Sequence, residues 1–457
     1  MRNKSDLPRQ KLSLCRVLAL TATLVLSGSY TPAWSMNLLQ AYEAALIEDA
    51  QIRSTRAATE ARRERLPQAK SQLMPSLSAS VSRNTNTLER VAPNSFGNSV
   101  TTSTQYGSSN ETLTLRQPIF RMLQMADYQQ AQAQVNDAEA LLEKELQNVS
   151  VRVSSAYFES LLASEQLELV LIQKAATTTQ LDAARKRLLA GAGTRTDIDE
   201  ALAALDLRAS QELEARQNID FAFRQLQALI NRPITTLAPL DIEKMQLLHP
   251  DPSRVEDWIE RAEQDSPEIQ SFKAQVMAAS YEVKKAKAGH LPTLDAIAQW
   301  SRQDSDTVYS VNNRTTNTSV GLQLNIPIFA GGLVNSQVRQ ALAEQERAEQ
   351  ALEALRRDLG LRLHREFRGV SEGVLRIKAL EQAVVSLEQV VISNRRSFQA
   401  GSRTVMDILN AEQQKASAQR DLSQARFVYL MSRIRLQALA GGPKTEVINQ
   451  INEWLAP

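Results

Sequence analysis

Two long stretches of the chain, residues 121–190 and 333–400, carry no proline, and the first also carries no glycine. Ala, Gln, Glu, Arg and Leu dominate both stretches, and these residue types favour helix. At 1.5 Å per residue, each stretch would form a helix of roughly 100 Å. A helix of that length needs partner helices along it, as in a coiled coil. The sequence therefore argues against a compact domain and predicts an elongated helical protein.

Each long stretch is followed, after a short turn, by a second stretch with the same composition, at 194–230 and 402–440. Two consecutive helices joined by a short turn form a hairpin. We therefore expect two long helical hairpins, over 121–230 and 333–440. The hairpins alone would also fit an intracellular coiled-coil scaffold. The strands and the signal peptide described below argue against that alternative.

The chain repeats one order of signals twice. Ala190-Gly191 followed by Asp197 recurs as Ala400-Gly401 followed by Asp407, 210 residues later. Further matched segments are LMPSL (73–77) with HLPTL (290–294), and LRQPIF (115–120) with LNIPIF (324–329). An offset of 208 would align GTRT with GSRT, but we prefer 210 because acidic and alanine positions downstream then agree. A period this long indicates a duplicated domain.

Each half is expected to open with a helix, about 37–70 and 254–288, with Ser266-Pro267 as a candidate N-cap and N1 pair for the second. After each opening helix comes a proline and then a segment in which apolar and polar residues alternate, which is the strand signal. The predicted strand pairs are 76–84 with 112–120, and 292–301 with 319–328.

In the last strand, Val320, Leu322 and Leu324 should face lipid, while Gln323 and Asn325 face the interior. The segments between the paired strands, roughly 85–111 and 302–318, are rich in Asn, Ser and Thr, so we expect them to be exposed outer loops. The alternation alone also fits two hairpins on a soluble domain; the flanking long helices favour membrane strands.

Membrane strands have to close into a barrel, because an open edge in lipid leaves backbone groups unpaired. Four strands are too few, since the smallest membrane barrels have about eight. The chain is therefore expected to oligomerise. Two copies would give eight strands with a filled interior, and three would give twelve with room for a lumen.

The first 35 residues have the pattern of a secretory signal peptide. A basic segment precedes a short apolar run at 17–26, and Ala33-Trp34-Ser35 offers a cleavage site before Met36. The alternative, a short N-terminal anchor helix, has the wrong length and flanks. Cys15, the only cysteine, precedes the apolar run, so lipidation is not expected. No later segment is apolar enough to predict a transmembrane helix.

Composition excludes several functions. Lys+Arg number 53 and Asp+Glu 51, so the charge balance argues against a nucleic-acid binder. One cysteine excludes a disulfide framework, and His249, His290 and His364 lie far apart, so a helix-borne zinc site has little support. The sequence carries no nucleophile elbow or phosphate loop. We predict no enzymatic activity, cofactor or metal.

The duplicated halves, LTLRQPIF (113–120), NIPIFAGG (325–332), AGAGTRTDIDEA (190–201) and AGSRTVMDILNAEQ (400–413) resemble the TolC family of outer-membrane channel proteins. The resemblance covers about 37–442, and the segment AGHLPTLD (288–295) is most similar to the protease-secretion branch. It implies a mainly α fold with transmembrane β: a homotrimer with a twelve-stranded outer-membrane β-barrel, four strands per chain, continued by a long periplasmic α-helical barrel.

The expected division of the chain is a signal peptide (1–35), a first structural repeat (36–231), a linker or equatorial segment (232–253), a second structural repeat (254–442) and a C-terminal tail (443–457). The resemblance implies that the equatorial segment and the tail form a belt around the middle of the helical barrel.

The resemblance also implies a gate at the periplasmic end, formed by the helices after the two Ala-Gly turns. The positions that match the family's gate are Asp407, Asn410, Arg403, Phe398, Thr196 and Asp197. Asp407 would form a lumen-facing acidic ring, and Arg403 would tie one helix pair to the next through Thr196 and Asp197. Phe398 replaces a gate tyrosine, so one hydrogen bond is lost, and Asn410 replaces a second acidic ring. The alternative is an ordinary capped helix start, where acidic residues are favoured anyway.

The implied function is an exit duct that exports unfolded protein, such as a protease, from the Gram-negative cell across periplasm and outer membrane. Its partners would be an inner-membrane ABC transporter, a periplasmic adaptor, the secreted substrate and outer-membrane lipid, with no nucleic acid. Two alternatives stay open. One is the exit duct of a multidrug efflux pump; the other is a periplasmic coiled-coil protein or an adhesin, which would need no lumen.

Overall fold

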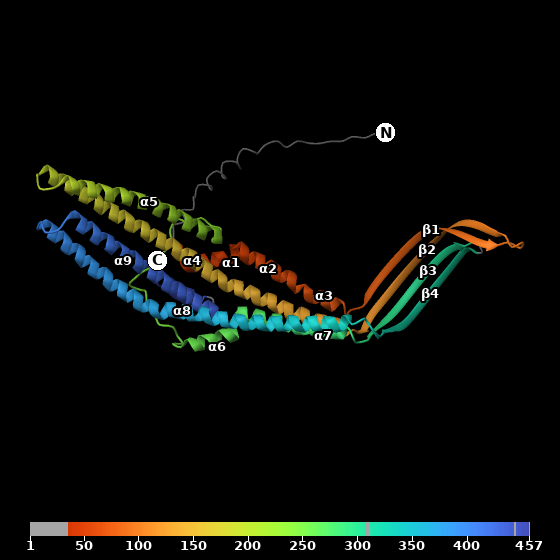
Figure 1. Cartoon of the computed structure of the whole chain (residues 1–457). Coiled ribbons are helices and arrows are strands. Elements are labelled where there is room, and N and C mark those ends of the chain that lie inside the picture. The colour runs from red at the N-terminus through yellow and green to blue at the C-terminus, as the bar shows by residue number, and fades with distance from the viewer. Residues whose placement is uncertain (1–34, 308–309, 443–444, 457) are drawn as a thin grey trace, which may run out of the picture.

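The computed structural model describes residues 35–307, 310–442 and 445–456, and the predicted signal peptide lies outside these residues except for its last position. The described chain is elongated: a β-sheet forms one end, and the tips of two helical hairpins form the other (Figure 1). The strands are β1 (Ser76–Pro93), β2 (Ser99–Phe120), β3 (Thr293–Thr307) and β4 (Ser310–Asn325). The short helices are α1 (Leu38–Glu48), α2 (Ala50–Arg63), α3 (Arg65–Ser71), α6 (Val255–Asp265), α7 (Pro267–Ala288) and α10 (Glu446–Asn452).

Four long helices make the two hairpins. They are α4 (Met122–Leu189), α5 (Arg195–Ile230), α8 (Leu333–Gln399) and α9 (Val405–Leu439). Their bounds follow the stretches free of glycine and proline, apart from the glycines inside α8. α4 has 68 residues and α8 has 67, so each spans roughly 100 Å, as expected. Among the described residues, no helix combines the length and the apolar character needed to cross a bilayer.

The single helix expected over 37–70 is wrong: the structure divides it into α1, α2 and α3. The first break lies at Asp49, whose backbone is extended and whose side chain accepts a hydrogen bond from Gln51 N at 2.7 Å. The same carboxylate also pairs with Arg152 of α4 at 2.6 Å. Because Asp49 caps α2 and anchors it to α4, the chain turns there instead of continuing one straight helix.

The second opening helix is also divided, into α6 and α7. Ser266 is the N-cap of α7 and Pro267 its first residue, at the position that the Ser-Pro pair predicted. The Ser266 side chain makes no capping hydrogen bond, so the break follows from the proline, which cannot continue a preceding helix. α7 packs on α4 and α8 along the half of the molecule nearest the sheet.

The sheet is antiparallel with strand order β1-β2-β3-β4. The strands are longer than expected, because the predicted outer loop 85–111 is mostly paired strand: Arg83 pairs with Ser109 and Pro93 with Ser99. The second predicted loop, 302–318, is likewise strand where the structure describes it. The alternating apolar signal stops in these polar segments, although backbone pairing continues through them. Sequence periodicity therefore marked only the apolar part of each strand.

Register places apolar residues of all four strands on one face. Leu77 pairs with Leu115, Leu115 with Ala298, and Ala298 with Val320, so a single row crosses the sheet. Leu77 is 67% exposed and Val320 82% exposed in the single chain. The next row contains Leu113 opposite Trp300. An exposed apolar face of this kind needs an apolar environment to cover it.

The main core lies at the middle of the molecule, where chain segments far apart in sequence meet. Leu240 forms a β-bridge with Leu455, and Asp241 N donates to Trp454 O at 2.8 Å. Met36, which precedes α1, forms a parallel β-bridge with Leu237 on the same segment. We call this part, residues 232–253 with α10 and the residues up to 456, the equatorial belt. The structure thus brings together the two segments that we expected to form it.

Two buried tyrosines, one in each hairpin, fasten the belt to the long helices. Tyr157 of α4 donates from its hydroxyl to Ala238 O at 2.9 Å. The Tyr429 hydroxyl of α9 accepts from Leu248 N and donates to Leu248 O, both at 2.8 Å. Neither ring is exposed to solvent. The hairpins are therefore anchored at the belt and extend from it toward their tips.

Candidate functional site

The two hairpin tips have the same local structure. α4 and α8 are each followed by a C-cap alanine and then by a glycine with positive φ, +73° at Gly191 and +79° at Gly401. Glycine adopts this left-handed conformation without a Cβ clash, which is why it ends both helices. In both tips a hydrogen bond then closes the turn, from Ala192 N to Arg187 O at 2.9 Å and from Ser402 N to Ser397 O at 3.0 Å.

The second helix of each hairpin begins with the same capping box. Thr194 caps α5 and pairs reciprocally with Asp197, while Thr404 caps α9 and pairs reciprocally with Asp407. In each box the acidic side chain accepts from the backbone N–H of its threonine at 2.9 Å. These boxes lie 210 residues apart, which confirms the preferred register of the duplication over the alternative of 208.

Asp407 carries most of the polar contacts at the second tip. Its carboxylate accepts from Thr404 N, from the Thr404 hydroxyl at 3.0 Å and from Arg403 Nη1 at 3.2 Å. These groups hold the pKa of Asp407 below its ordinary value, with the Thr404 hydrogen bonds contributing more than the Arg403 charge. The carboxylate is therefore ionised at neutral pH.

Arg403 does not reach the partner that we expected within the chain. Its guanidinium is bonded to Asp407, four residues on, whereas Asp197 is bonded to Thr194. A side chain four residues away on the same helix turn is the nearest available carboxylate. Thr196 is exposed on the first turn of α5, and Asn410 is exposed on the second turn of α9. A role for these residues in a gate stays a prediction.

Phe398 makes a contact that the sequence did not suggest. The guanidinium carbon of Arg187, on α4, lies 4.2 Å from the centroid of the Phe398 ring, on α8. This is a cation–π contact between the two hairpins. Position 398 therefore supplies an aromatic face to Arg187, without the hydroxyl that a tyrosine would add.

A second group of residues, which the sequence interpretation missed, lies between the tips and the equatorial belt. Glu412 of α9 accepts from Gln180 of α4 at 2.9 Å and from Arg395 of α8 at 2.6 Å. Glu412 belongs to the AGSRTVMDILNAEQ segment, but its partners are distant in sequence, and no local pattern identifies them.

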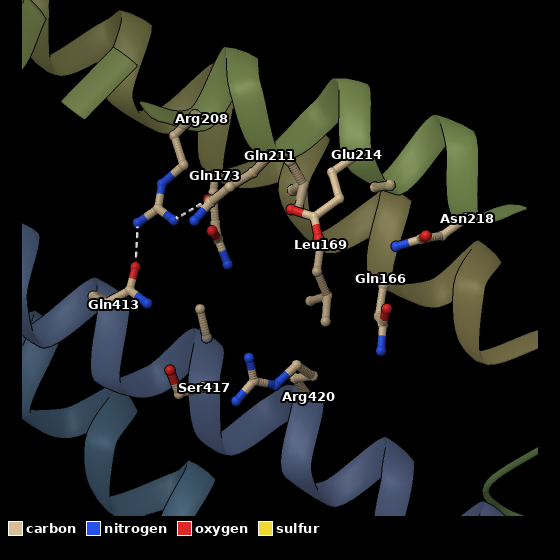
Figure 2. Close-up of a pocket in the computed structure, with 13 residues that line it drawn as sticks. Gln166, Leu169, Gln173, Arg208, Gln211, Glu214, Asn218, Gln413, Ser417 and Arg420 are labelled. Atoms are coloured by element: carbon tan, nitrogen blue, oxygen red, sulfur yellow. Dashed lines mark hydrogen bonds between the residues drawn. The ribbon is translucent and has the colours of Figure 1, made fainter. Parts of the chain in front are cut away.

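A polar cavity of about 220 Å³ lies beside this group, between α4, α5 and α9 (Figure 2). On one side, Arg208 of α5 donates to Gln211 and to Gln413 of α9, at 2.7 Å and 2.5 Å. On the other side, Ser417 and Arg420 of α9 line it (Figure 2). The described residues contain no group of three or more His, Cys, Asp or Glu arranged to hold a metal ion. The polar and charged side chains that line this cavity can make hydrogen bonds between α4, α5 and α9.

Comparisons with known proteins agree over nearly the whole chain. A model of the family described as "Outer membrane efflux protein" matches residues 41–232 and 258–442. The chain is 30% identical over 438 residues to "Proteases secretion protein PrtF" of Dickeya chrysanthemi, covering 95% of each protein. It is 32% identical over 411 residues to "Alkaline protease secretion protein AprF" of Pseudomonas aeruginosa, covering 90% of this chain and 85% of the relative.

A solved structure shows the same fold. The outer-membrane channel CmeC of Campylobacter jejuni superposes with a TM-score of 0.76 at 16% identity, over 99% of this chain and 98% of that one. At this identity the likeness bears on the fold alone. It covers both the sheet and the helical hairpins, because nearly all of each chain is included.

Proposed function

The chain belongs to the outer membrane efflux protein family, and from that premise we propose that it is an outer-membrane exit duct for secreted protein, with proteases as the first candidate cargo. The family match confirms the resemblance that the duplicated motifs indicated. The relatives are secretion and channel proteins, so no catalytic role is proposed.

The observation that carries this proposal is the incomplete sheet. β1 and β4 are its outer strands, and each has one edge without a partner among the described residues. The exposed apolar face suits lipid, and lipid does not tolerate open strand edges. Several copies therefore have to share one barrel. A homotrimer supplies twelve strands, which lies within the range of outer-membrane barrels and leaves room for a lumen.

The helical hairpins extend that lumen away from the membrane. Their tips lie at the opposite end of the molecule from the sheet (Figure 1). An inner-membrane ABC transporter and a periplasmic adaptor would engage the tips. Unfolded substrate would then pass through the helical and β-barrels in turn.

The choice of cargo rests on the relatives. Both PrtF and AprF are described as protease secretion proteins, and both align with most of this chain. The family description also includes efflux, so a drug-efflux duct is the outcome that an experiment has to distinguish.

Complementation tests the cargo. The chain would replace PrtF in a Dickeya chrysanthemi strain lacking that protein, and extracellular protease activity would be measured beside resistance to a panel of toxic compounds. Recovery of protease export supports the proposal. Recovery of resistance alone would assign the chain to efflux.

Channel formation tests the duct itself. The purified full chain would be added to planar lipid bilayers, and single-channel currents recorded. Discrete conductance steps are expected. A periplasmic coiled coil or an adhesin would give none, and that result would overturn the duct.

A further inference from the structure

The apolar face of the sheet ends at a charged row on the side away from the helices. Trp300 pairs with Leu113 near the end of that face. Four residues farther along each strand, one row crosses the whole sheet through backbone pairing: Arg83 with Ser109, Ser109 with Asp304, and Asp304 with Arg314. Side chains of a strand alternate between its two faces, so residues four apart share a face. The charged row therefore lies on the same face as the apolar residues.

Asp304 holds two arginines of this region. Its carboxylate accepts from Arg314 Nε at 2.8 Å, and Arg302 Nη2 lies 3.7 Å from its other oxygen. Arg302 is also opposite Glu111 in the row between Trp300 and Asp304. The Arg302 side chain is 35% exposed and that of Arg314 61%. Both guanidinium groups are thus oriented by carboxylates and still have N–H groups to donate, because each carries five.

Arg83 stands apart from this group on the same row. It is exposed, and it forms no ion pair among the described residues. Neighbouring strands are about 4.8 Å apart, so the backbones of Arg83 and Asp304, which are two strands apart, are separated by about 10 Å. Together with Glu111, the charged side chains of this region leave one net positive charge per chain.

The charged row lies at the height where the lipid-facing band should end. Leu324, at the helix side of the apolar face, and Arg314 are ten residues apart on β4. At about 3.3 Å per residue this is about 33 Å along the strand, and a tilt of about 40° reduces it to about 25 Å across the membrane. The apolar band of outer-membrane barrels is about 25 Å tall and is bordered by aromatic residues. The row is therefore at the outer boundary of the band, just beyond Trp300.

Phosphate groups are the anions present at this height on the cell surface. The outer leaflet of a Gram-negative outer membrane contains a glycolipid whose disaccharide headgroup carries phosphates directly above its acyl chains. A guanidinium group binds phosphate through parallel N–H donors, and such charge-assisted hydrogen bonds are stronger than neutral ones. Guanidinium groups at two places about 10 Å apart suit a headgroup that carries more than one phosphate.

We propose that Arg83, Arg302 and Arg314 form a binding site for the phosphates of outer-leaflet glycolipid, with Asp304 as the residue that positions Arg302 and Arg314. The site is repeated once per chain around the barrel, and it fixes the height of the barrel in the membrane by tying the end of the apolar band to the headgroups. The proposal rests on the proposed function only in that it needs the sheet to span the outer membrane.

Arg90 provides a matched control for Arg83. It lies on the same strand, seven residues farther from the helices, where it pairs with Thr102. An odd separation places it on the opposite face of the strand. Arg90→Gln therefore removes the same charge from the same strand and leaves the outward face unchanged.

Lipid titration of the full-chain complex in non-ionic detergent tests the site. The probe is lipid A with both phosphates, and its dephosphorylated form is the control ligand. Wild type should bind the phosphorylated form roughly tenfold more tightly. Arg83→Gln should weaken its binding roughly fivefold, whereas Arg83→Lys, which keeps the charge, and Arg90→Gln should each stay within about twofold of wild type. Mass measurement of each complex checks that assembly is unchanged.

Three results would overturn the site. Equal binding of the two lipid forms would mean that the apolar band alone holds the lipid. Equal losses in the Arg83→Gln and Arg90→Gln proteins would mean that only the overall charge matters. Displacement of lipid A by inorganic phosphate at the same concentration would identify a site for a free anion instead of a lipid headgroup.

Asp304→Asn tests the positioning role. The change adds one net positive charge per chain, so charge alone would tighten the binding of lipid A. Loss of orientation at Arg302 and Arg314 should instead weaken it, by roughly threefold. Unchanged or tighter binding would overturn the role of Asp304.

Single-channel recording separates this site from the duct. Arg83 is on the outward face, so Arg83→Gln should conduct as wild type does. If wild type conducts but shows no preference for phosphorylated lipid A, the site is overturned and the duct stands. If wild type shows that preference but gives no channels, the duct is overturned and the site stands.

Discussion

At the scale of single residues, the Asp407 carboxylate has two roles, one in helix capping and one as a charge near the tip. It completes the capping box of α9 with Thr404, and it carries a negative charge near the tip that Arg403 partly neutralises. An asparagine at position 407 keeps a side-chain oxygen that can accept the same hydrogen bond from Thr404 N. Substitution therefore separates the charge from the cap.

Asp407→Asn should reduce the preference of the channel for cations while leaving assembly unchanged. Three carboxylates around one axis would attract cations, and the neutral Asn410 adds no charge. Arg403→Ser should act in the opposite direction, because it removes the charge that offsets Asp407. Reversal potentials in a KCl gradient measure both. Identical potentials in all three proteins would show that Asp407 does not face the lumen.

The pH dependence of this selectivity follows from the lowered pKa of Asp407. Its carboxylate is more acidic than an ordinary aspartate, whose pKa is about 3.9. The charge is therefore present at pH 5 and above, and it is lost only as the pH falls through this lowered pKa. Cation preference should be constant from pH 7 to pH 5. A midpoint within this range would contradict the assignment.

The sequence predicts contacts within a turn better than contacts between helices. Thr194–Asp197 and Thr404–Asp407 span three residues, so helix geometry alone brings each pair together. Gln180 and Glu412 lie 232 residues apart. Contact between them depends on how each long helix is rotated about its axis in the bundle. The sequence does not fix that rotation, because several faces of each helix have similar polar composition.

At the scale of helices, glycines set the distance between α8 and α9. A Cβ at Gly369 would collide with the Ser432 side chain, and one at Gly373 would come within 3.2 Å of the Tyr429 ring. Both glycines therefore allow α9 to approach α8 closely near the equatorial belt. Gly360, on the same helix, has open space where a Cβ would be added.

Gly369→Ala should destabilise the protein by about 1–3 kcal/mol, because the packed helices have to separate. Gly360→Ala should be neutral or stabilising by up to about 1 kcal/mol, because alanine favours helix. Guanidinium-induced unfolding in detergent compares the two midpoints. Adding Ser432→Gly should destabilise the Gly369→Ala protein less than it destabilises wild type, because it removes the clashing side chain although the new glycine itself disfavours helix. Equal losses in the two backgrounds would mean that the clash is not the cause.

Strand register shows which apolar residues of β4 lie nearest the middle of the strand. Leu324 is next to the end of β4, where the sheet meets the helices, and so lies away from the middle of the strand. Val320 lies on the same face of β4 but closer to the middle of the strand. Strand boundaries could not be read from the sequence, because the polar parts of β1 to β4 carry no apolar alternation.

Val320→Arg should destabilise assembly by roughly 2–4 kcal/mol, the range for a charge facing lipid at mid-membrane. Leu324→Arg should destabilise assembly less. Ser319→Arg, on the opposite face of the strand, should have little effect on assembly. The yield of heat-resistant complex in outer-membrane extracts measures this. Equal tolerance at Val320 and Ser319 would show that the apolar row does not face lipid.

At the scale of the molecule, stoichiometry follows from the two unpaired sheet edges. Mass measurement of the detergent-extracted complex should give three chains, hence twelve strands. A dimer would give eight strands and a filled interior, which would exclude a protein-conducting lumen, and a monomer would contradict the shared barrel.

The uninterrupted course of α4 and α8 through the belt has a mechanical consequence. Each hairpin beyond the belt is a lever about 50 Å long, since α9 has 35 residues. A rotation of about 5° at the fulcrum, where Tyr157 and Tyr429 are anchored, sweeps a tip through roughly 4 Å. A protein that pulls sideways on the tips therefore works with leverage against the belt, and needs only a small force to widen the entrance.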